Sequence, residues 1–514
     1  MRRAFLVFAV TFLIVAAIYG RVPIAFLRAE SGWFLSLSHS DQATQLPVVR
    51  GFLTHSYAGH YTPLAFLAEL TVAKFAGTSR TFWRWRQLLA VAAVGAVLFG
   101  LVLASGRRLA LRRPQQFAIA AVLTALVLFQ PAMVDFVTWP FMILQLGWLG
   151  LSLGALCCLG KILSAPSRPS WTWLAAGSAY ASLHLSGLGL ITVGATAAVF
   201  GWFALRGDRP MRVRAFWFCA VLILLGLLHA AVMARSLTAS SAITESPSLA
   251  ATLRYSLGFV FNFVASGLLS FTLISRDLPE AHSIEYCWPL GLLLLVLAIA
   301  GLAFQLRRSR REANLPLQFA TMLVLFSTVG FAAMIALITG RQLATGPNAA
   351  AAMRYLLVTP RYIIPLQFVF IGPVILALSW LANRMPRFIV IVSWALIPTI
   401  LLTQLVYQRK AMPFLTSGTR TSHYTCWRLL LAAAQECRAA GVPLPNFSMA
   451  PLTIEFSEAD VEAFLPLLRN DLRLRPDEKI ELAPLQSYVE GDSERYRLAP
   501  SVKKFEQKLE VARN

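Results

Sequence analysis

Residues 88–105 read LLAVAAVGAVLFGLVLAS, an uncharged apolar run that decides the fold class of this chain. About 20 such residues in a helix cross the ~30 Å hydrocarbon core of a bilayer. Similar apolar stretches recur at residues 4–20, 116–130, 141–163, 172–186, 187–205, 216–235, 288–305, 318–340, 362–382 and 388–405. The sequence therefore predicts an all-α polytopic membrane protein with about eleven transmembrane helices.

Composition points to the same class and divides the chain in two. Apolar residues make up 57% of the 514 residues and charged residues only 14%, which excludes a water-soluble protein of this size. We expect a membrane domain over residues 1–405 and a small, mostly helical appendage over residues 406–514. Within that appendage, residues 427–440 (WRLLLAAAQECRAA) have helical periodicity and are followed by Gly441, a common helix terminator.

The net charge of +22 reflects membrane topology. Basic residues cluster in five short connectors between apolar stretches, as the positive-inside bias produces, so we place these connectors in the cytoplasm. They are Arg107, Arg108, Arg112 and Arg113; Lys161 and Arg168; Arg206, Arg209, Arg212 and Arg214; Arg307, Arg308, Arg310 and Arg311; and Arg384 and Arg387. Eleven spans then give a cytoplasmic N-terminus and an extracytoplasmic tail. No basic face is interleaved with aromatics, so we expect no nucleic-acid partner.

Two long segments lie on the external side in this topology, at residues 21–85 and 236–287. The second contains Leu257–Ser275 (LGFVFNFVASGLLSFTLIS), which is apolar enough to span. A span there would place Arg307–Arg311 outside, so an interfacial or re-entrant segment is the better interpretation. The first is unusually long for a connection between spans, which indicates a working site above the bilayer.

Few residues in this chain have the chemistry of an active site. There is no G-x-x-x-x-G-K-[ST] and no H-E-x-x-H, so neither ATP-driven transport nor a zinc protease of that type has support. Two carboxylates remain near the external membrane boundary, Asp41 in the first loop and Asp135 at the end of the third span. A carboxylate at that depth is costly unless it is paired, hydrated or used.

Three short motifs accompany these acids in a fixed order. The first loop continues after Asp41 with His60-Tyr61-Thr62-Pro63-Leu64. Pro131, Asp135, Val137 and Trp139 form the second motif, and Arg361-Tyr362-Ile363-Ile364-Pro365 opens a late span. With these elements the chain resembles the GT-C class of integral membrane glycosyltransferases, over roughly residues 1–405.

The resemblance implies transfer of a sugar from a polyprenyl-phosphate donor to a lipid, glycan or protein acceptor, at the outer face of a bacterial plasma membrane. Asp41 would be the general base and Asp135 a second catalytic acid, while Arg354 or Arg361 would stabilise the leaving phosphate. His60, Tyr61 and Tyr362 would bind substrate. Such enzymes often carry paired acids in this loop, whereas Ser40 precedes Asp41 here. We therefore expect an inverting displacement without a divalent metal or other cofactor.

Other interpretations stay open. Asp41 could instead cap a helix over residues 42–50, and Asp135 could have a structural role at the end of a span. Arg354 and Arg361 could both anchor the protein at the membrane interface. His39, His55 and His60 could bind a metal with Asp41. His184 and His229 fit packing histidines better than a proton relay. For the whole protein, the alternatives are a non-catalytic lipid-binding scaffold of the same class and a secondary transporter or flippase. A transporter would show broken helices and internal repeats.

Overall fold

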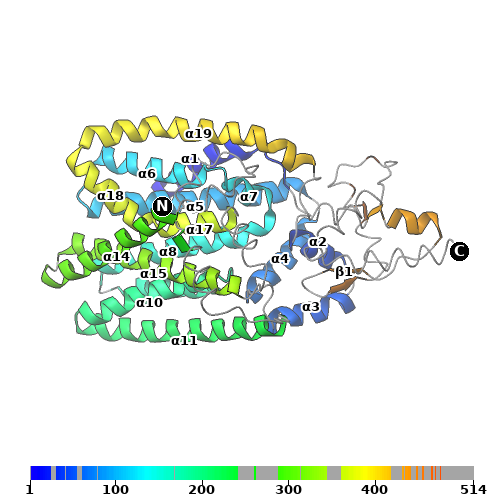
Figure 1. Cartoon of the computed structure of the whole chain (residues 1–514), viewed down its shortest axis with the longest axis horizontal. Coiled ribbons are helices and arrows are strands. Elements are labelled where there is room, and N and C mark those ends of the chain that lie inside the picture. The colour runs from blue at the N-terminus through cyan, green and yellow to red at the C-terminus, as the bar shows by residue number, and fades with distance from the viewer. Residues whose placement is uncertain are drawn as a thin grey trace.

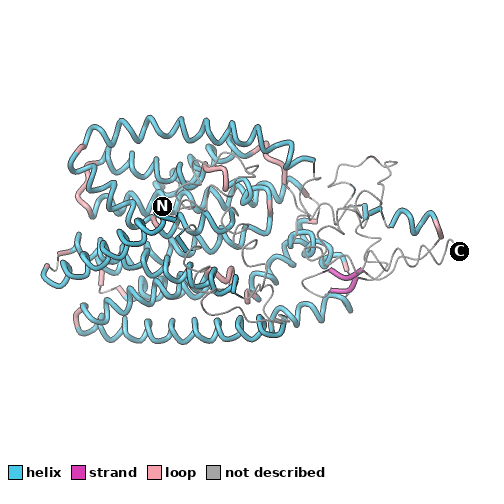
Figure 2. Tube along the Cα trace, viewed as in Figure 1, coloured by secondary structure: helices cyan, strands magenta, loops and turns pink. Residues whose placement is uncertain are grey.

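Helices dominate the described structure, with two short strands near one end (Figure 2). The computed structural model describes residues 2–24, 30–40, 42–54, 61–77, 79–166, 168–240, 260–261, 288–312, 314–343, 360–417, 431–432, 434–441, 447–449, 454–456, 465–466, 469 and 475. The predicted class, a helical multi-pass membrane protein, is confirmed by the long apolar helices. Leu257–Ser275 falls outside the described residues, apart from residues 260–261.

The elements share one elongated arrangement, a bundle with small helices at one end (Figure 1). In chain order they are α1 (Arg2–Tyr19), α2 (Glu30–His39), α3 (Gln42–Thr54), α4 (Pro63–Ala76), α5 (Arg80–Arg108), α6 (Arg113–Leu128), α7 (Met133–Thr138), η1 (Pro140–Met142), α8 (Ile143–Ser164), α9 (Pro169–Leu183), α10 (Gly189–Arg206), α11 (Arg209–Ser240), α14 (Trp288–Arg311), α15 (Leu315–Leu343), α17 (Pro360–Val369), α18 (Ile371–Arg384), α19 (Pro386–Ser417), β1 (Phe447–Met449) and β2 (Ile454–Phe456).

Each predicted apolar stretch falls on helix, and seven helical segments in the described part of the chain are long and apolar enough to cross a membrane. These are α5, η1 with α8, α10, α11, α14, α15 and α19. Two helices extend well past their predicted spans: α19 continues to Ser417, twelve residues beyond residue 405, and α5 begins eight residues before residue 88. Ser79 starts it early, because its Oγ accepts a hydrogen bond from the Phe82 amide at 3.3 Å.

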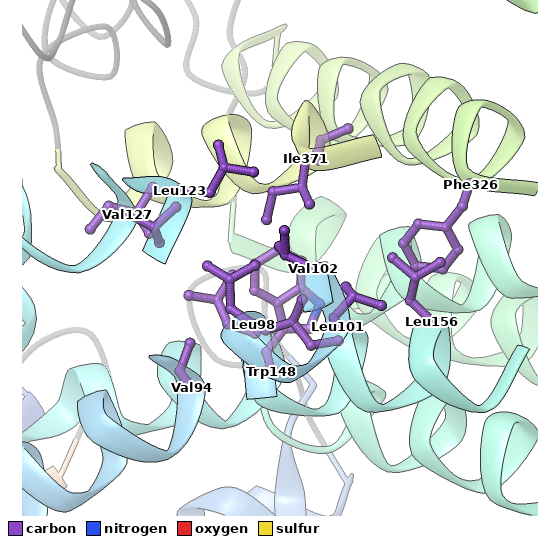
Figure 3. Packing of buried hydrophobic residues seen from close by; sticks show 14 of the residues in the cluster. Val94, Leu98, Leu101, Val102, Leu123, Val127, Trp148, Leu156, Phe326 and Ile371 are labelled. Atoms are coloured by element: carbon purple, nitrogen blue, oxygen red, sulfur yellow. The ribbon is translucent and has the colours of Figure 1, made fainter. Parts of the chain in front are cut away.

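The bundle has a central group of helices and a lipid-facing group. Half or more of the apolar span is buried in α5, α8, α10 and α15, against 6% in α14. Figure 3 shows Leu98, Leu101 and Trp148 grouped together in this interior. Trp148 is fully buried, and its Nε1 donates a hydrogen bond to Thr192 Oγ1 at 2.9 Å, so the indole has a polar partner in an apolar core.

The predicted span at residues 362–382 falls on two helices, α17 and α18, which are separated at Phe370. Pro373 has no amide hydrogen to donate to the Val369 carbonyl, and the Phe370 amide donates to Gln367 O at 3.1 Å in a tighter turn. Just after the break, a Cβ atom at Gly372 would lie 2.6 Å from Leu323 O. The absence of a side chain there lets α18 cross close to α15.

The five basic connectors gather at one end of the bundle, here named the arginine end. Arg108 Nη2 donates hydrogen bonds to Gly160 O at 3.0 Å and to Ser164 Oγ, and its guanidinium lies 4.8 Å from the Phe319 ring centroid. Gln115 Nε2 donates to Ala382 O at 2.8 Å. These contacts join four connectors, and Figure 1 shows the α10–α11 connection at the same end. The helices α2, α3 and α4 lie at the opposite end, here named the loop end.

The C-terminal appendage contains both helix and strand. Residues 431–432 and 434–439 are helical, and Gly441 follows with φ of +67°, consistent with the predicted helix and its glycine terminator. Besides helix, the described residues of the appendage include two short strands, β1 and β2, which pair antiparallel with Ser448 opposite Glu455. These strands have three residues each, too short for alternation to be visible in the sequence. Strand β2 packs against α3.

The arginine end and the loop end lie at opposite ends of the bundle, so we expect a reagent to reach them from opposite sides of the membrane. Thr71 on α4 and Arg311 at the end of α14 are both exposed. With the six native cysteines replaced by serine, a membrane-impermeant maleimide added to intact vesicles should label either Thr71→Cys or Arg311→Cys, and the other only after permeabilisation. Labelling of both from the same side would contradict the arrangement.

Candidate functional site

Four phenylalanines attach the first loop to the bundle. Phe66 of α4 lies 5.1 Å from Phe52 of α3 and 5.7 Å from Phe34 of α2, measured between ring centroids. Phe34 in turn lies 6.0 Å from Phe141 of η1. The Phe141 amide also donates a hydrogen bond to Ser31 Oγ at 2.9 Å. Aromatic pairs at these separations stabilise a contact beyond their buried area, so the loop helices are packed onto the segment that follows α7.

A buried ion pair fixes α4 against α5. Glu69 accepts a hydrogen bond from Arg86 Nη2, and their side chains are only 5% and 14% exposed. The Arg86 guanidinium also lies 5.2 Å from the centroid of Trp83, whose Nε1 donates to Gly77 O at 2.9 Å. Gly77, with φ of +49°, ends α4 one residue past Ala76. Burial raises the pKa of the Glu69 carboxyl, and the charge and hydrogen bond of Arg86 oppose that rise.

Gln87, one residue after Arg86, holds the short helix that carries Asp135. Its Nε2 donates hydrogen bonds to Phe136 O at 2.8 Å and to Trp139 O at 3.0 Å. Trp139 separates α7 from Pro140, which opens η1, so α7 ends after six residues and leaves carbonyl groups that need donors. Asp135 is 6% exposed in the first turn of α7. Gln87 thereby fixes the backbone on the C-terminal side of the buried Asp135.

Asp135 on α7 and Tyr362 on α17 lie on helices that pack against each other. Tyr362 is buried at 5% exposure. Tyr61 has different partners: its hydroxyl donates to Leu53 O at 3.1 Å, and its ring lies 5.4 Å from that of His229. The second and third sequence motifs therefore meet, while Tyr61 contacts α3 and α11.

The remaining predicted site residues are not covered by the structure. Asp41, His60 and Arg354 lie outside the described residues, as does the side chain of Arg361, whose backbone belongs to α17. His55 and the side chain of His39 lie outside them too. In the part of the chain that is described, no three His, Cys, Asp or Glu residues gather in a way that could hold a metal ion.

The sequence motifs did not include three residues of this region, Glu69, Arg86 and Gln87. Glu69 is the one acid in the apolar helix PLAFLAELTVAKFA, and a carboxyl on such a helix needs a cationic partner if it is buried. That signal was available in the sequence. It did not distinguish Arg86 from Arg80 or Arg84, because the choice depends on the angle at which α4 meets α5.

Comparison with protein-family models, with curated proteins and with solved structures gives no match for this chain.

Removal of one partner from the Glu69–Arg86 pair should be strongly destabilising. Glu69→Gln leaves the buried Arg86 charge without a counter-charge, and we expect a loss of about 3 kcal/mol in unfolding free energy. The matched control is Glu312→Gln, which removes an exposed pair with Arg308, 3.5 Å apart and about half solvent-exposed. That loss should stay below about 0.5 kcal/mol. Thermal unfolding in lipid nanodiscs measures both; equal shifts would show that the pair does not fasten α4.

Proposed function

We propose that this protein is a glycosyltransferase of the GT-C type, which moves a sugar from a polyprenyl-phosphate donor to a lipid, glycan or protein acceptor. One observation carries the proposal. The first-loop helices, the helix with Asp135 and the helix with Tyr362 all lie away from the arginine end, and α2, η1 and α7 form a continuous packed region there. A single reaction site needs this convergence of motifs from distant parts of the chain.

The reaction requires few groups. Asp41 accepts the proton of the acceptor hydroxyl as that oxygen bonds to the anomeric carbon of the sugar. The bond from this carbon to the phosphate oxygen breaks, and polyprenyl phosphate leaves with the electron pair. Arg361 or Arg354 stabilises the charge on the leaving phosphate. A single displacement of this kind inverts the anomeric centre and needs no divalent metal.

Asp135 has a supporting catalytic role in this proposal. Asp135 is buried and Gln87 holds its helix, which suits a group that orients a sugar hydroxyl. Tyr362, on the helix packed against α7, would bind the same substrate. His60 and Tyr61 would contact it from the start of α4.

The proposal also assigns an orientation. Eleven membrane crossings, with α17 and α18 counted as one, put all five basic connectors and the N-terminus in the cytoplasm of a bacterium, in the plasma membrane. The loop end and the C-terminal appendage then face outward, where membrane lipids, the lipid-linked donor and the acceptor meet.

One observation favours a secondary transporter as the second candidate. The interruption between α17 and α18 is a broken helix in the membrane region, a feature that transporters use at their binding sites. A non-catalytic scaffold of the same class is the third candidate.

The direct test is donor turnover by purified protein with Asp41→Asn. This change keeps the side-chain size and removes the base, so we expect release of sugar from polyprenyl-phosphate donors to fall by about 100-fold or more. Asp208→Asn is the matched control, because Asp208 is exposed at the arginine end, where its Oδ1 accepts from the Met211 amide at 3.2 Å. It should retain full turnover. Equal rates in wild type and Asp41→Asn would remove Asp41 from the mechanism, and no turnover by wild type with any donor would favour the transporter or the scaffold.

A further inference from the structure

The helix α4 lies across the loop end of the bundle and is held near both of its ends. In its first turn, the Ala65 amide donates to His184 O at 3.2 Å, at the residue where α9 ends. Directly after its last residue, Gly77 O accepts a hydrogen bond at 2.9 Å from Nε1 of Trp83, in the first turn of α5. A helix tied to the loop ends of two bundle helices runs over the end of the bundle (Figure 1).

One face of α4 is packed against the protein. Phe66, Glu69 and Ala73 are buried and recur every three or four residues, so they lie on one side of the helix. Phe66 meets aromatic rings of α2 and α3, and Glu69 pairs with Arg86 of α5. This face therefore has its partners within the chain.

The other face of α4 is exposed and uncharged. Its residues are Leu64, Ala68, Thr71 and Phe75, whose spacing of four, three and four residues places them in one stripe, here named the α4 stripe. Leu64 is 59% exposed and Phe75 is 86% exposed. The Thr71 hydroxyl donates to Leu67 O at 2.7 Å, so its polarity is satisfied within the helix. An apolar stripe of this kind is expected to contact something other than water.

The lipid-facing side of α5 begins close to the end of α4. Three residues separate the two helices, and Phe82 and Trp85 on α5 are each 45% exposed. The 29 residues of α5 give a length of about 43 Å, which matches the ~40–45 Å of a bilayer with its headgroup layers. The uncharged run starts about two turns inside α5, at residue 88, so these aromatic rings lie at headgroup level, where such side chains are enriched. The end of α4 lies beside them.

The charges beside the α4 stripe suit the phosphate groups of lipids. Residues 70–86 contain no acidic residue, and their charged residues are Lys74, Arg80, Arg84 and Arg86. The single acid of α4, Glu69, is buried and paired with Arg86. Lys74 is exposed on α4. A lysine at a membrane boundary packs its apolar stem against lipid and extends its ammonium group to the anionic headgroups.

We propose that α4 is an interfacial helix whose stripe binds the surface of the membrane that this protein spans, with Lys74 at the lipid phosphates. The stripe is continuous with the lipid-facing side of α5, which is why its partner is the bilayer and not a second protein. Leu64 and Phe75 enter the boundary between headgroups and acyl chains, the depth at which amphipathic helices bind. Thr71 stays at the wet headgroup level, within reach of a water-soluble reagent. The contact sets the height of the first loop above the bilayer, for an enzyme, a scaffold or a transporter alike.

The test measures the depth of single residues in lipid nanodiscs of phosphatidylcholine and phosphatidylglycerol. With the six native cysteines replaced by serine, a nitroxide is attached to Leu64→Cys or Phe75→Cys in the full chain. Electron paramagnetic resonance compares collisions with oxygen, which concentrates in lipid, and with a water-soluble nickel chelate. Thr54→Cys on α3 is the water control and Val296→Cys on α14 the lipid control, since both residues are exposed. We expect oxygen-to-nickel ratios at Leu64 and Phe75 several-fold above that at Thr54 and below that at Val296.

Two outcomes overturn the proposal. A ratio equal to that of Thr54 would show that the stripe faces water. Protection from both reagents would show that protein covers it, and dipolar broadening between labels would identify a second copy of the chain. Leu64 and Phe75 lie near opposite ends of α4, so a folding defect in one variant leaves the other as the test.

The role of Lys74 is tested separately. Lys74→Gln should lower the oxygen-to-nickel ratio at Phe75 more in nanodiscs with phosphatidylglycerol than in phosphatidylcholine alone, because the lost attraction is to anionic lipid. Equal effects in both would remove Lys74 from the contact. Neither experiment needs turnover, so a failed donor assay would leave the membrane contact standing, and normal turnover would not rescue a stripe that faces water.

Discussion

The ion pair between Glu69 and Arg86 is the contact on which the loop end depends. Two charges removed from water have a desolvation cost of several kcal/mol each, which their attraction offsets only with good geometry and further contacts. Trp83 supplies one such contact beneath the guanidinium. Glu69 lies four residues after Ala65 on α4. Because Arg86 fixes Glu69, the Ala65 amide is placed at the His184 carbonyl and Phe66 is placed in the aromatic cluster. One pair thereby sets the position of α4 relative to both α5 and α9.

Charge and packing give the two ends of the bundle different properties. At the arginine end, Arg108 is satisfied by carbonyl and hydroxyl oxygens and by the Phe319 ring, which is a structural use of a cation. At the loop end, the Arg86 guanidinium pairs with Glu69 and lies over the Trp83 ring, so its charge fastens α4 to α5.

Much of the helical framework could be predicted because apolar stretches of about 20 residues have few other stable structures in a chain of this composition. The details of the helices were harder to predict, because single residues decide them. Ser79 caps α5 eight residues before the apolar run begins, and Pro373 removes the hydrogen bond that would have joined α17 to α18.

The site was harder to predict than the framework. Asp135 stood out because its carboxyl lies within an apolar context, and Tyr362 because of its motif. The partner of Glu69 and the contact of Ala65 with His184 depend on how helices pack, over separations of 17 and 119 residues. Sequence spacing contains no signal for such pairs when only one chain is read.

The most direct test of the account is a charge exchange between α4 and α5. Glu69→Arg and Arg86→Glu should each lower the unfolding temperature and abolish donor turnover, since like charges would then face each other in a buried place. The double variant restores opposite charges, and we predict that it recovers most of the stability and measurable turnover. A double variant no better than either single one would contradict the role of this pair, and full turnover in the single variants would separate the pair from the working site.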